Sequence, residues 1–199
     1  MRIKNIFDKN FIDVIPNFLN EVELKEVIKS LDGMPWYFSS RANDNTIKRY
    51  DTNLNFTFLD TPEPISDYSK LNGVSQNILK KLNHIYGVKF KPHNAYLNCY
   101  EYGDEMQVHT DRQTKPGHNR TVIIYLNSTD QWDIEWSGHT ILFDKDKKNI
   151  LKTSIPFRNN LLCFDGELPH GISPISKSCY EKRIILVYQT EIENANSDI

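Results

Sequence analysis

The feature that most constrains this chain is a change of hydrophobic pattern after Pro92, where apolar and polar residues begin to alternate. The alternation runs through eight short segments that are separated by turn-forming residues. We expect strands at 94–100, 106–111, 120–127, 139–144, 149–155, 160–165, 170–175 and 182–189. Alternation places the apolar side chains of a strand on one face. Many short strands without helices between them are typical of a jelly roll or small barrel rather than of βαβ units.

The first half of the chain carries two helical patterns. One begins after Asn20, a candidate N-cap with Glu23 three residues later as in a capping box, and it is closed by Gly33. The other covers about residues 65–86, where apolar residues recur at helical spacing despite Gly73. Both apolar stripes are expected to face the core, so residues 1–93 are predicted to support the sheet with helices.

A polar, Asn-rich segment lies between these helices and is expected to combine short strands with loops. Mobile lids over active sites share this composition with ordinary surface loops. Both interpretations therefore stay open for residues 41–60, and equally for the loop at 112–120.

The composition favours a single intracellular domain spanning residues 1–199. A length of 199 residues with 39% hydrophobic residues suits one core, and a net charge of −2 implies no general attraction to nucleic acid or to an acidic membrane. No apolar stretch approaches the length of a membrane span, and the three cysteines lack CxxC spacing. We expect a cytoplasmic protein with reduced cysteines, no membrane partner and a frayed tail at 191–199, and we make no prediction of its oligomeric state.

The sequence HTD offers two candidate metal ligands, His109 and Asp111. Their separation by two positions in a strand places both side chains on the same face. A third candidate, His170, begins another predicted strand, and a jelly roll brings such distant strands together. Two imidazoles and one carboxylate leave coordination positions open, as O₂ activation at Fe(II) requires, whereas zinc sites are more often tetrahedral.

The other histidines are weaker candidates for metal binding. They lie on a predicted helix (His84), before the first barrel strand (His93) and in a polar loop (His118). His139 begins a strand near the expected site, but the set of three ligands is complete without it.

These residues stand within ordered blocks, namely CYEYGDEMQVHTD, RTVIIYLN, WDIEWSGHTILFD, NLLCFDGELPHGISPI and KRIILVYQ. Over residues 94–190 the blocks resemble the Fe(II)/2-oxoglutarate-dependent oxygenases, and within that superfamily the prolyl 4-hydroxylase-like group. The resemblance implies a mainly β fold with N-terminal helices (α+β), whose centre is a double-stranded β-helix (jelly roll, cupin-like). It implies Fe(II), 2-oxoglutarate and O₂ as cofactor and co-substrates, with ascorbate as an optional reductant.

The resemblance also implies roles for individual residues. It assigns His109, Asp111 and His170 to iron, and it assigns Arg183 to the far carboxylate of 2-oxoglutarate, which a guanidinium can hold by two parallel hydrogen bonds. The remaining assignments concern the pocket around 2-oxoglutarate: Tyr125 as a hydrogen-bond donor, Tyr100 as a lining residue and Ile141 as an apolar wall. Both tyrosines could equally be core aromatics.

Two departures from the prolyl 4-hydroxylase-like pattern concern the pocket. Gly138-His139 replaces the usual Gly-Gly before a barrel strand, which is expected to narrow or polarise the pocket rim. The spacing from His170 to Arg183 is longer than is usual in that group, so the register of the last strand needs to be checked.

A rival resemblance is to AlkB-type nucleic-acid demethylases, in which Asn98 and Tyr100 would bind 2-oxoglutarate. That group carries a later run in which an Asn and a second Arg stand where this chain has Ile185 and Gln189. The demethylase interpretation is therefore placed second.

The resemblance favours hydroxylation of a peptidyl proline, with succinate and CO₂ as co-products. The aromatic residues Trp36, Tyr37, Trp132 and Trp136 offer surface for such a peptide, unless they serve the core. A basic loop with Arg112, Lys115 and Arg120 could dock an acidic segment or a phosphate backbone, although a solvated loop is the simpler interpretation. Free amino acids and nucleic acids remain alternative substrates, and a jelly roll that binds a ligand without catalysis is the alternative outside enzymes.

Overall fold

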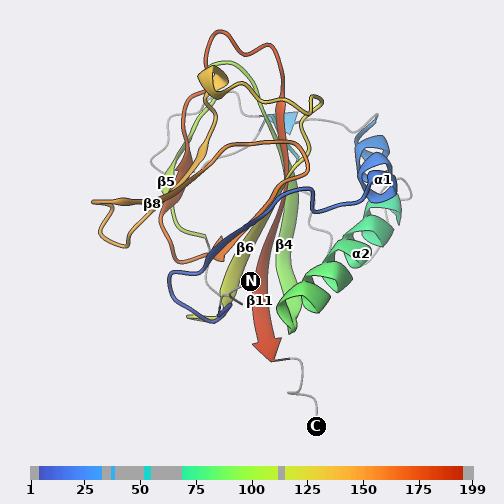
Figure 1. Cartoon of the computed structure of the whole chain (residues 1–199), viewed down its shortest axis with the longest axis vertical. Coiled ribbons are helices and arrows are strands. Elements are labelled where there is room, and N and C mark those ends of the chain that lie inside the picture. The colour runs from blue at the N-terminus through green and yellow to red at the C-terminus, as the bar shows by residue number, and fades with distance from the viewer. Residues whose placement is uncertain (1–4, 33–36, 39–51, 55–68, 112–114, 195–199) are drawn as a thin grey trace.

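The computed structural model describes residues 5–32, 37–38, 52–54, 69–111 and 115–194, which form two antiparallel sheets and two helices (Figure 1). The larger sheet contains, in spatial order, β1 (Ile12–Ile15), β9 (Leu161–Asp165), β6 (Asn119–Tyr125), β11 (Arg183–Asn194), β4 (Val88–Tyr100), β3 (Thr52–Leu54) and β2 (Tyr37–Phe38). The smaller sheet contains β5 (Met106–His109), β10 (His170–Ile172), β7 (Thr140–Phe143) and β8 (Ile150–Ser154). The helices are α1 (Glu21–Leu31) and α2 (Ser69–Tyr86), with a short 3₁₀ helix at Ile134–Trp136. The predicted jelly roll with N-terminal helices is confirmed.

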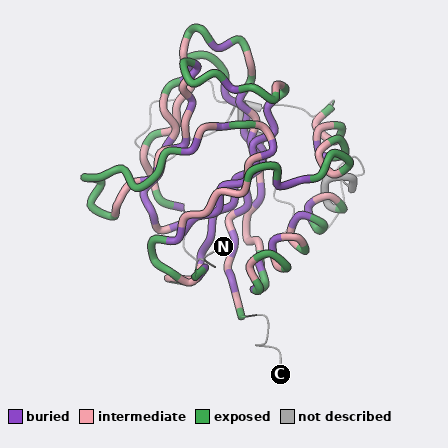
Figure 2. The backbone as a smooth tube through the Cα atoms, in the orientation of Figure 1, coloured by how far each residue is buried: buried purple, intermediate pink, exposed green. Residues whose placement is uncertain are grey.

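The strands of the larger sheet are buried on both faces because each face covers a different core. Leu186 packs with the outer core, to which α1 and α2 contribute Val27 and Leu82. Its neighbours Ile185 and Val187 pack with the inner core between the two sheets. Figure 2 shows the buried residues gathered along these strands, while the turn between β7 and β8 and most of β8 are exposed. The site described below lies in the inner core.

Helix α1 forms where its capping residues predict it. The side chain of Asn20 accepts hydrogen bonds from the backbone of Val22 and Glu23, at 3.0 and 2.9 Å, and the Glu23 carboxylate accepts the Asn20 N–H at 2.8 Å. This reciprocal capping box satisfies amide groups that the first turn leaves without helical partners. The helix ends at Leu31 with Asp32 as its C-cap, and Gly33 lies outside the described residues.

The strand predictions are right in number and order after Pro92, but several ends differ, most of all the start of β4 and the end of β11. β4 begins at Val88 and pairs along its length with β11, which continues to Asn194. The predicted tail is therefore strand up to that residue, because Ile192 is fully buried in the outer core. Residues 195–199 lie outside the described part of the chain.

The short strands expected between the two helices are present as β2 and β3. β1 was not predicted; it pairs with β9 at one edge of the larger sheet. With four residues, β1 offers too few positions for alternation to be recognised.

The two candidate lid segments fall mainly on residues that are not described. Residues 41–51, 55–60 and 112–114 lie outside the described residues, as does the start of the predicted second helix at 65–68. The lid function stays a prediction. Among the described helices, none is long and apolar enough to cross a membrane.

Candidate metal centre and anion-binding pocket

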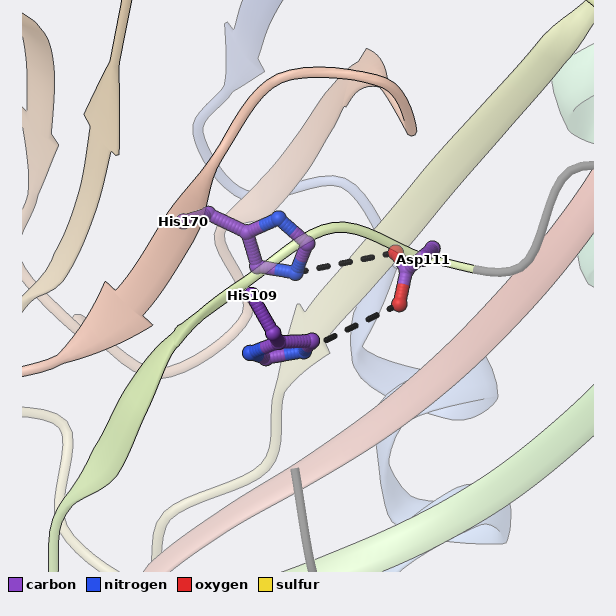
Figure 3. Close-up of side chains that lie close together, drawn as sticks. All are labelled: His109, Asp111 and His170. Atoms are coloured by element: carbon purple, nitrogen blue, oxygen red, sulfur yellow. Dashed lines mark ion pairs between the residues drawn. The ribbon is translucent and has the colours of Figure 1, made fainter. Parts of the chain in front are cut away.

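Three predicted ligands meet at one end of the inner core. His109 ends β5, His170 begins β10, and the two residues are directly paired in the register of the smaller sheet. One ligand atom from each histidine and one from Asp111 lie within 4.8 Å of one another (Figure 3). The His109 and His170 Nε2 atoms are 3.9 and 3.6 Å from the nearest Asp111 oxygens. The cluster has the size and the donor atoms to hold one metal ion.

A glycine next to His170 allows this pairing. A Cβ atom on Gly171 would lie 2.7 Å from the Met106 carbonyl oxygen of β5. Real Cβ atoms essentially never come so close to backbone, so any side chain at this position would push β10 away from β5. Gly171 therefore helps to keep the two imidazoles adjacent.

Backbone carbonyls orient both imidazoles. Nδ1 of His109 lies 2.8 Å from the Gln107 carbonyl oxygen, and Nδ1 of His170 lies 2.9 Å from that of Leu168. A carbonyl can only accept, so Nδ1 carries the proton and the lone pair of a neutral ring stands on Nε2. Burial, helped by the neighbouring His170, lowers the pKa of His109 and favours this neutral form. Both rings thus present Nε2 as a ligand toward Asp111.

Side chains from the larger sheet orient the carboxylate of Asp111. Oδ1 accepts a hydrogen bond from Gln189 Nε2 at 2.6 Å, and Oδ2 accepts one from the hydroxyl of Thr121. Neither donor was identified as a site residue from the sequence. Gln189 had been considered only as the replacement for an arginine.

A pocket leads from the metal cluster into the inner core. The lining includes both histidines and Thr121 at one end, and Tyr100 and Thr140 at the other. The residues between the ends are mostly apolar or aromatic: Tyr96, Met106, Ile123, Ile172, Ile185 and Val187.

Arg183 is fully buried beside the far end of this pocket. Its Nε donates to the Gly138 carbonyl at 2.8 Å and its Nη2 donates to the Thr140 hydroxyl at 2.8 Å. The guanidinium carbon lies 5.3 and 5.4 Å from the ring centroids of Tyr100 and Tyr125. Nη1 has no hydrogen-bond partner, and among the described residues no carboxylate forms an ion pair with this cation. Burial of an unpaired cation is costly, so the arrangement is suited to bind an anion.

The other predicted pocket residues gather around Arg183, with one exception. Tyr125 donates its hydroxyl to Thr140 at 2.9 Å, and Asn98 donates to the Tyr100 hydroxyl at 3.0 Å, while Asn98 Oδ1 is buried without a partner. Ile141 is the exception. Thr140 lines the pocket in its place, because successive residues of β7 face opposite ways.

Gly138 makes room for Arg183 just before β7. Its φ is +67°, a conformation that favours glycine. A Cβ here would lie 3.1 Å from Ile175 and 3.4 Å from Arg183. The absence of a side chain at Gly138 thus leaves space for Arg183. The next residue, His139, is half-buried, and its pKa is lowered by burial and by the charge of Arg183.

The remaining histidines do not join the metal cluster. His84 is exposed on α2, and His93 lies on β4. Nδ1 of His118 lies 3.1 Å from the Ile192 carbonyl oxygen. Within the described residues, His109, Asp111 and His170 are the one group of potential ligands that comes together.

Of the three basic residues expected in one surface loop, Arg120 does not belong to the surface. Arg120 is fully buried, where its Nε donates to the Ile6 carbonyl at 2.7 Å and its Nη1 lies 3.6 Å from Asp165. It belongs to β6 and holds the N-terminal segment against the sheet. Lys115 is exposed and lies 3.8 Å from Glu191, and Arg112 is outside the described residues.

Of the two interpretations left open for the aromatic residues, core packing holds for Trp132 and Trp136. Trp132 and Trp136 are buried with ring centroids 5.4 Å apart, and the Trp132 indole donates to the Ser137 carbonyl at 2.9 Å. They therefore serve the inner core. Trp36 and the side chain of Tyr37 lie outside the described residues.

Comparisons with known proteins agree with this geometry. Residues 95–189 match the family model of the 2OG-Fe(II) oxygenase superfamily. No curated protein sequence matches the chain.

Solved structures share the fold at low sequence identity. A prolyl-4-hydroxylase from Pseudomonas putida is 16% identical with a TM-score of 0.61, and 92% of each chain is covered. A 2OG-Fe(II) oxygenase family oxidoreductase from Burkholderia pseudomallei is 12% identical with a TM-score of 0.68, covering 90% of this chain and 84% of that one. A prolyl hydroxylase from Trichoplax adhaerens, solved with a peptide fragment of the hypoxia inducible factor oxygen degradation domain, is 18% identical with a TM-score of 0.62, covering 90% and 83%.

Proposed function

We propose that this chain, whose residues 95–189 match the model of the 2OG-Fe(II) oxygenase superfamily, is an Fe(II)- and 2-oxoglutarate-dependent dioxygenase. It hydroxylates a C–H bond, with a peptidyl proline as the favoured substrate. In this proposal residues 1–199 act as one domain.

The observation that carries the proposal is the buried cation of Arg183. It lacks a carboxylate partner among the described residues and stands beside the pocket that opens onto His109, Asp111 and His170. A ligand with a metal-binding group at one end and a carboxylate at the other fits both ends of this pocket. 2-Oxoglutarate has this form, with a keto acid at one end and a second carboxylate at the other.

The residues present fit the cofactor and co-substrate. The two imidazoles and Asp111 would hold Fe(II), and Arg183 with Tyr125 would hold the far carboxylate. Asn98 has a buried amide with unused hydrogen-bonding capacity and would contact the same ligand. When bound, Fe(II) and 2-oxoglutarate together use O₂ to hydroxylate the substrate, and they release succinate and CO₂.

The protein's own contribution to the reaction is binding, orientation and exclusion of water. The two histidines present their Nε2 atoms, and Arg183 fixes the direction in which a dicarboxylate enters. Apolar side chains, among them Ile185 and Val187, line the space between the two ends. Low polarity there strengthens the attraction of each end for its charged group.

The fold supports proline as the favoured substrate without deciding it. Two of the similar structures are prolyl hydroxylases, one of them solved with a peptide fragment. Nucleic acid is the second candidate, because Asn98 and Tyr100 lie side by side in the pocket as the AlkB-type pattern expects.

A succinate-release assay tests the proposal. The full chain with Fe(II), 2-oxoglutarate and ascorbate is offered proline-containing peptides, free amino acids and methylated oligonucleotides. The proposal expects succinate formation stimulated by a peptide and hydroxyproline in the product. If only oligonucleotides stimulated succinate formation, the substrate would be a nucleic acid and not a peptide. If the chain formed no succinate with or without substrate and did not bind iron, the non-catalytic jelly roll would replace the enzyme.

A further inference from the structure

A row of three polar side chains crosses the inner face of the larger sheet at the metal cluster. Asn94 on β4, Gln189 on β11 and Thr121 on β6 are direct cross-strand partners. Residues that lie directly opposite in an antiparallel sheet project to the same face. The three side chains therefore form one line across three strands.

This polar row contrasts with the row next to it on the same face. Two residues along each strand, the corresponding positions are Tyr96, Val187 and Ile123. Polar groups in a buried sheet face are costly unless hydrogen bonds satisfy them. The row is thus expected to have a specific partner.

That partner is the carboxylate of Asp111. Asn94 Nδ2 donates to Gln189 Oε1 at 3.1 Å, Gln189 Nε2 donates to Asp111 Oδ1 at 2.6 Å, and Thr121 donates to Oδ2. A carboxylate can only accept, so Gln189 must present its NH₂ group to Asp111 and its carbonyl to Asn94. The chain of hydrogen bonds has one consistent direction, from β4 to Asp111.

The backbone explains why Asp111 needs this support. β5 ends at His109, so Asp111 stands beyond the strand that carries the first histidine. The histidine rings are held by carbonyl groups two residues away, whereas the Asp111 carboxylate is held by side chains 10 and 78 positions away in the sequence. In these contacts, backbone groups orient the two histidines and side chains orient Asp111.

The irregularity of the strand pairing lies at the same place. The register of β4 with β11 shifts between Gln189 and Thr190, which pair with Asn94 and Pro92. A β-bulge re-aims nearby side chains and is common beside active sites. Here it adjoins the residue whose amide reaches Asp111.

We propose that the row Asn94–Gln189–Thr121 positions the metal-binding carboxylate, with Gln189 as the principal positioning residue. The inference rests on the proposed function in taking Asp111 as a metal ligand. A neutral amide restrains the carboxylate and leaves its negative charge available to the cation. Loss of outer hydrogen bonds of this kind typically weakens metal binding by about 10- to 100-fold.

The test measures Co(II) and Mn(II) affinity of the full chain by calorimetry, together with the visible spectrum of bound Co(II). We expect Gln189→Met to weaken Co(II) binding at least tenfold and to change the spectrum. Thr121→Val should act in the same direction, Thr121→Ser should stay near wild type because it keeps the hydroxyl, and Asn94→Leu should give a smaller loss. The matched control is Gln131→Met, the same substitution in an exposed loop.

The outcomes separate this inference from the proposed function. If wild type binds Co(II) and Gln189→Met binds it within threefold with an unchanged spectrum, the positioning inference is overturned while the metal site stands. If His109→Ala binds as well as wild type, the metal site itself fails. Thermal melting without metal checks that each variant folds. If Gln189→Met does not fold, Thr121→Val is compared with Thr121→Ser instead. Co(II) affinity of Thr121→Val within threefold of Thr121→Ser, with the same spectrum, would then overturn the inference.

Discussion

Replacement of Arg183 by Met is expected to separate co-substrate binding from stability. Arg183 makes two hydrogen bonds, to the Gly138 carbonyl and the Thr140 hydroxyl, and one nitrogen is left for a ligand. Methionine keeps much of the apolar stem but removes the charge and every donor.

The effect on binding follows from the hydrogen bonds that a carboxylate would form. Two charge-assisted hydrogen bonds at about 1.5 kcal/mol each contribute about 3 kcal/mol. A difference of about 1.4 kcal/mol is tenfold in affinity, so 2-oxoglutarate binding should weaken about 100-fold. Arg183→Lys keeps a charge without the planar fork, and we expect an intermediate loss of about tenfold.

The effect on stability without ligand should be small. Removing the buried cation relieves a desolvation cost of several kcal/mol. Against this, the Gly138 carbonyl loses its donor at about 1–3 kcal/mol, and the Thr140 hydroxyl loses one of its two donors but keeps Tyr125. These terms oppose each other, and we expect the free energy of unfolding to change by no more than about 1 kcal/mol.

Anaerobic calorimetry with Mn(II) and 2-oxoglutarate measures the affinity, and urea unfolding measures the stability. The control is Lys182→Met, because this neighbour is exposed and its ammonium pairs with Glu101 at 2.8 Å. Unchanged 2-oxoglutarate affinity in Arg183→Met, with the protein folded, would refute the assignment of the buried cation to the co-substrate.

Three further predictions concern residues around the same pocket. Gly171→Ala should cost about 1–3 kcal/mol of stability by overpacking and should weaken Co(II) binding, because the added Cβ would lie 2.7 Å from the Met106 oxygen; urea unfolding and calorimetry measure both. Thr140→Val should weaken 2-oxoglutarate binding about 5- to 10-fold, because it removes the hydroxyl that accepts from Arg183. Calorimetry at a fixed metal concentration measures this affinity, and an unchanged value would contradict the prediction. The lowered pKa of His109 means that the unfolded state takes up its proton first, so metal-free stability should fall as pH drops below the ordinary value of 6.5; urea unfolding at pH 7 and 5.5 should show a smaller fall in His109→Asn.

The candidate metal centre was predictable because a short motif and strand pairing bring its residues together. His109 and Asp111 stand two positions apart at the end of β5, and His170 begins another strand of the same sheet. The predicted strand reached Asp111, whereas β5 ends at His109, so strand parity accounts for the histidine but not for the carboxylate. Arg183 was assigned by the family resemblance, and its register opposite Tyr100 agrees with a position on the inner face.

Sequence reasoning failed where it rested on the resemblance alone or where a distant partner determines a residue's position. The resemblance assigned Ile141 to the pocket wall, whereas Thr140, one position before it on β7, lines the pocket. Arg120 lies in a polar stretch that suggests a surface loop, yet it is buried against a carbonyl 114 positions away. No local pattern records such a contact, because its cause is the docking of the N-terminal segment on β6.

The role of Gln189 depends both on the family resemblance and on a distant partner in the fold. From the sequence it is a missing arginine, which weakens one family resemblance, whereas in the fold it is a donor that reaches Asp111. An arginine there would bring a positive charge next to the metal-binding carboxylate and compete with the cation for it. A neutral amide restrains the same oxygen without that competition. The positive charge of this face instead lies six residues along β11, at Arg183, beside the far end of the pocket. The neutral Gln189 and the charged Arg183 thus give the pocket a candidate metal site at one end and a buried protein cation at the other. A dicarboxylate that bound between them would have one favoured direction.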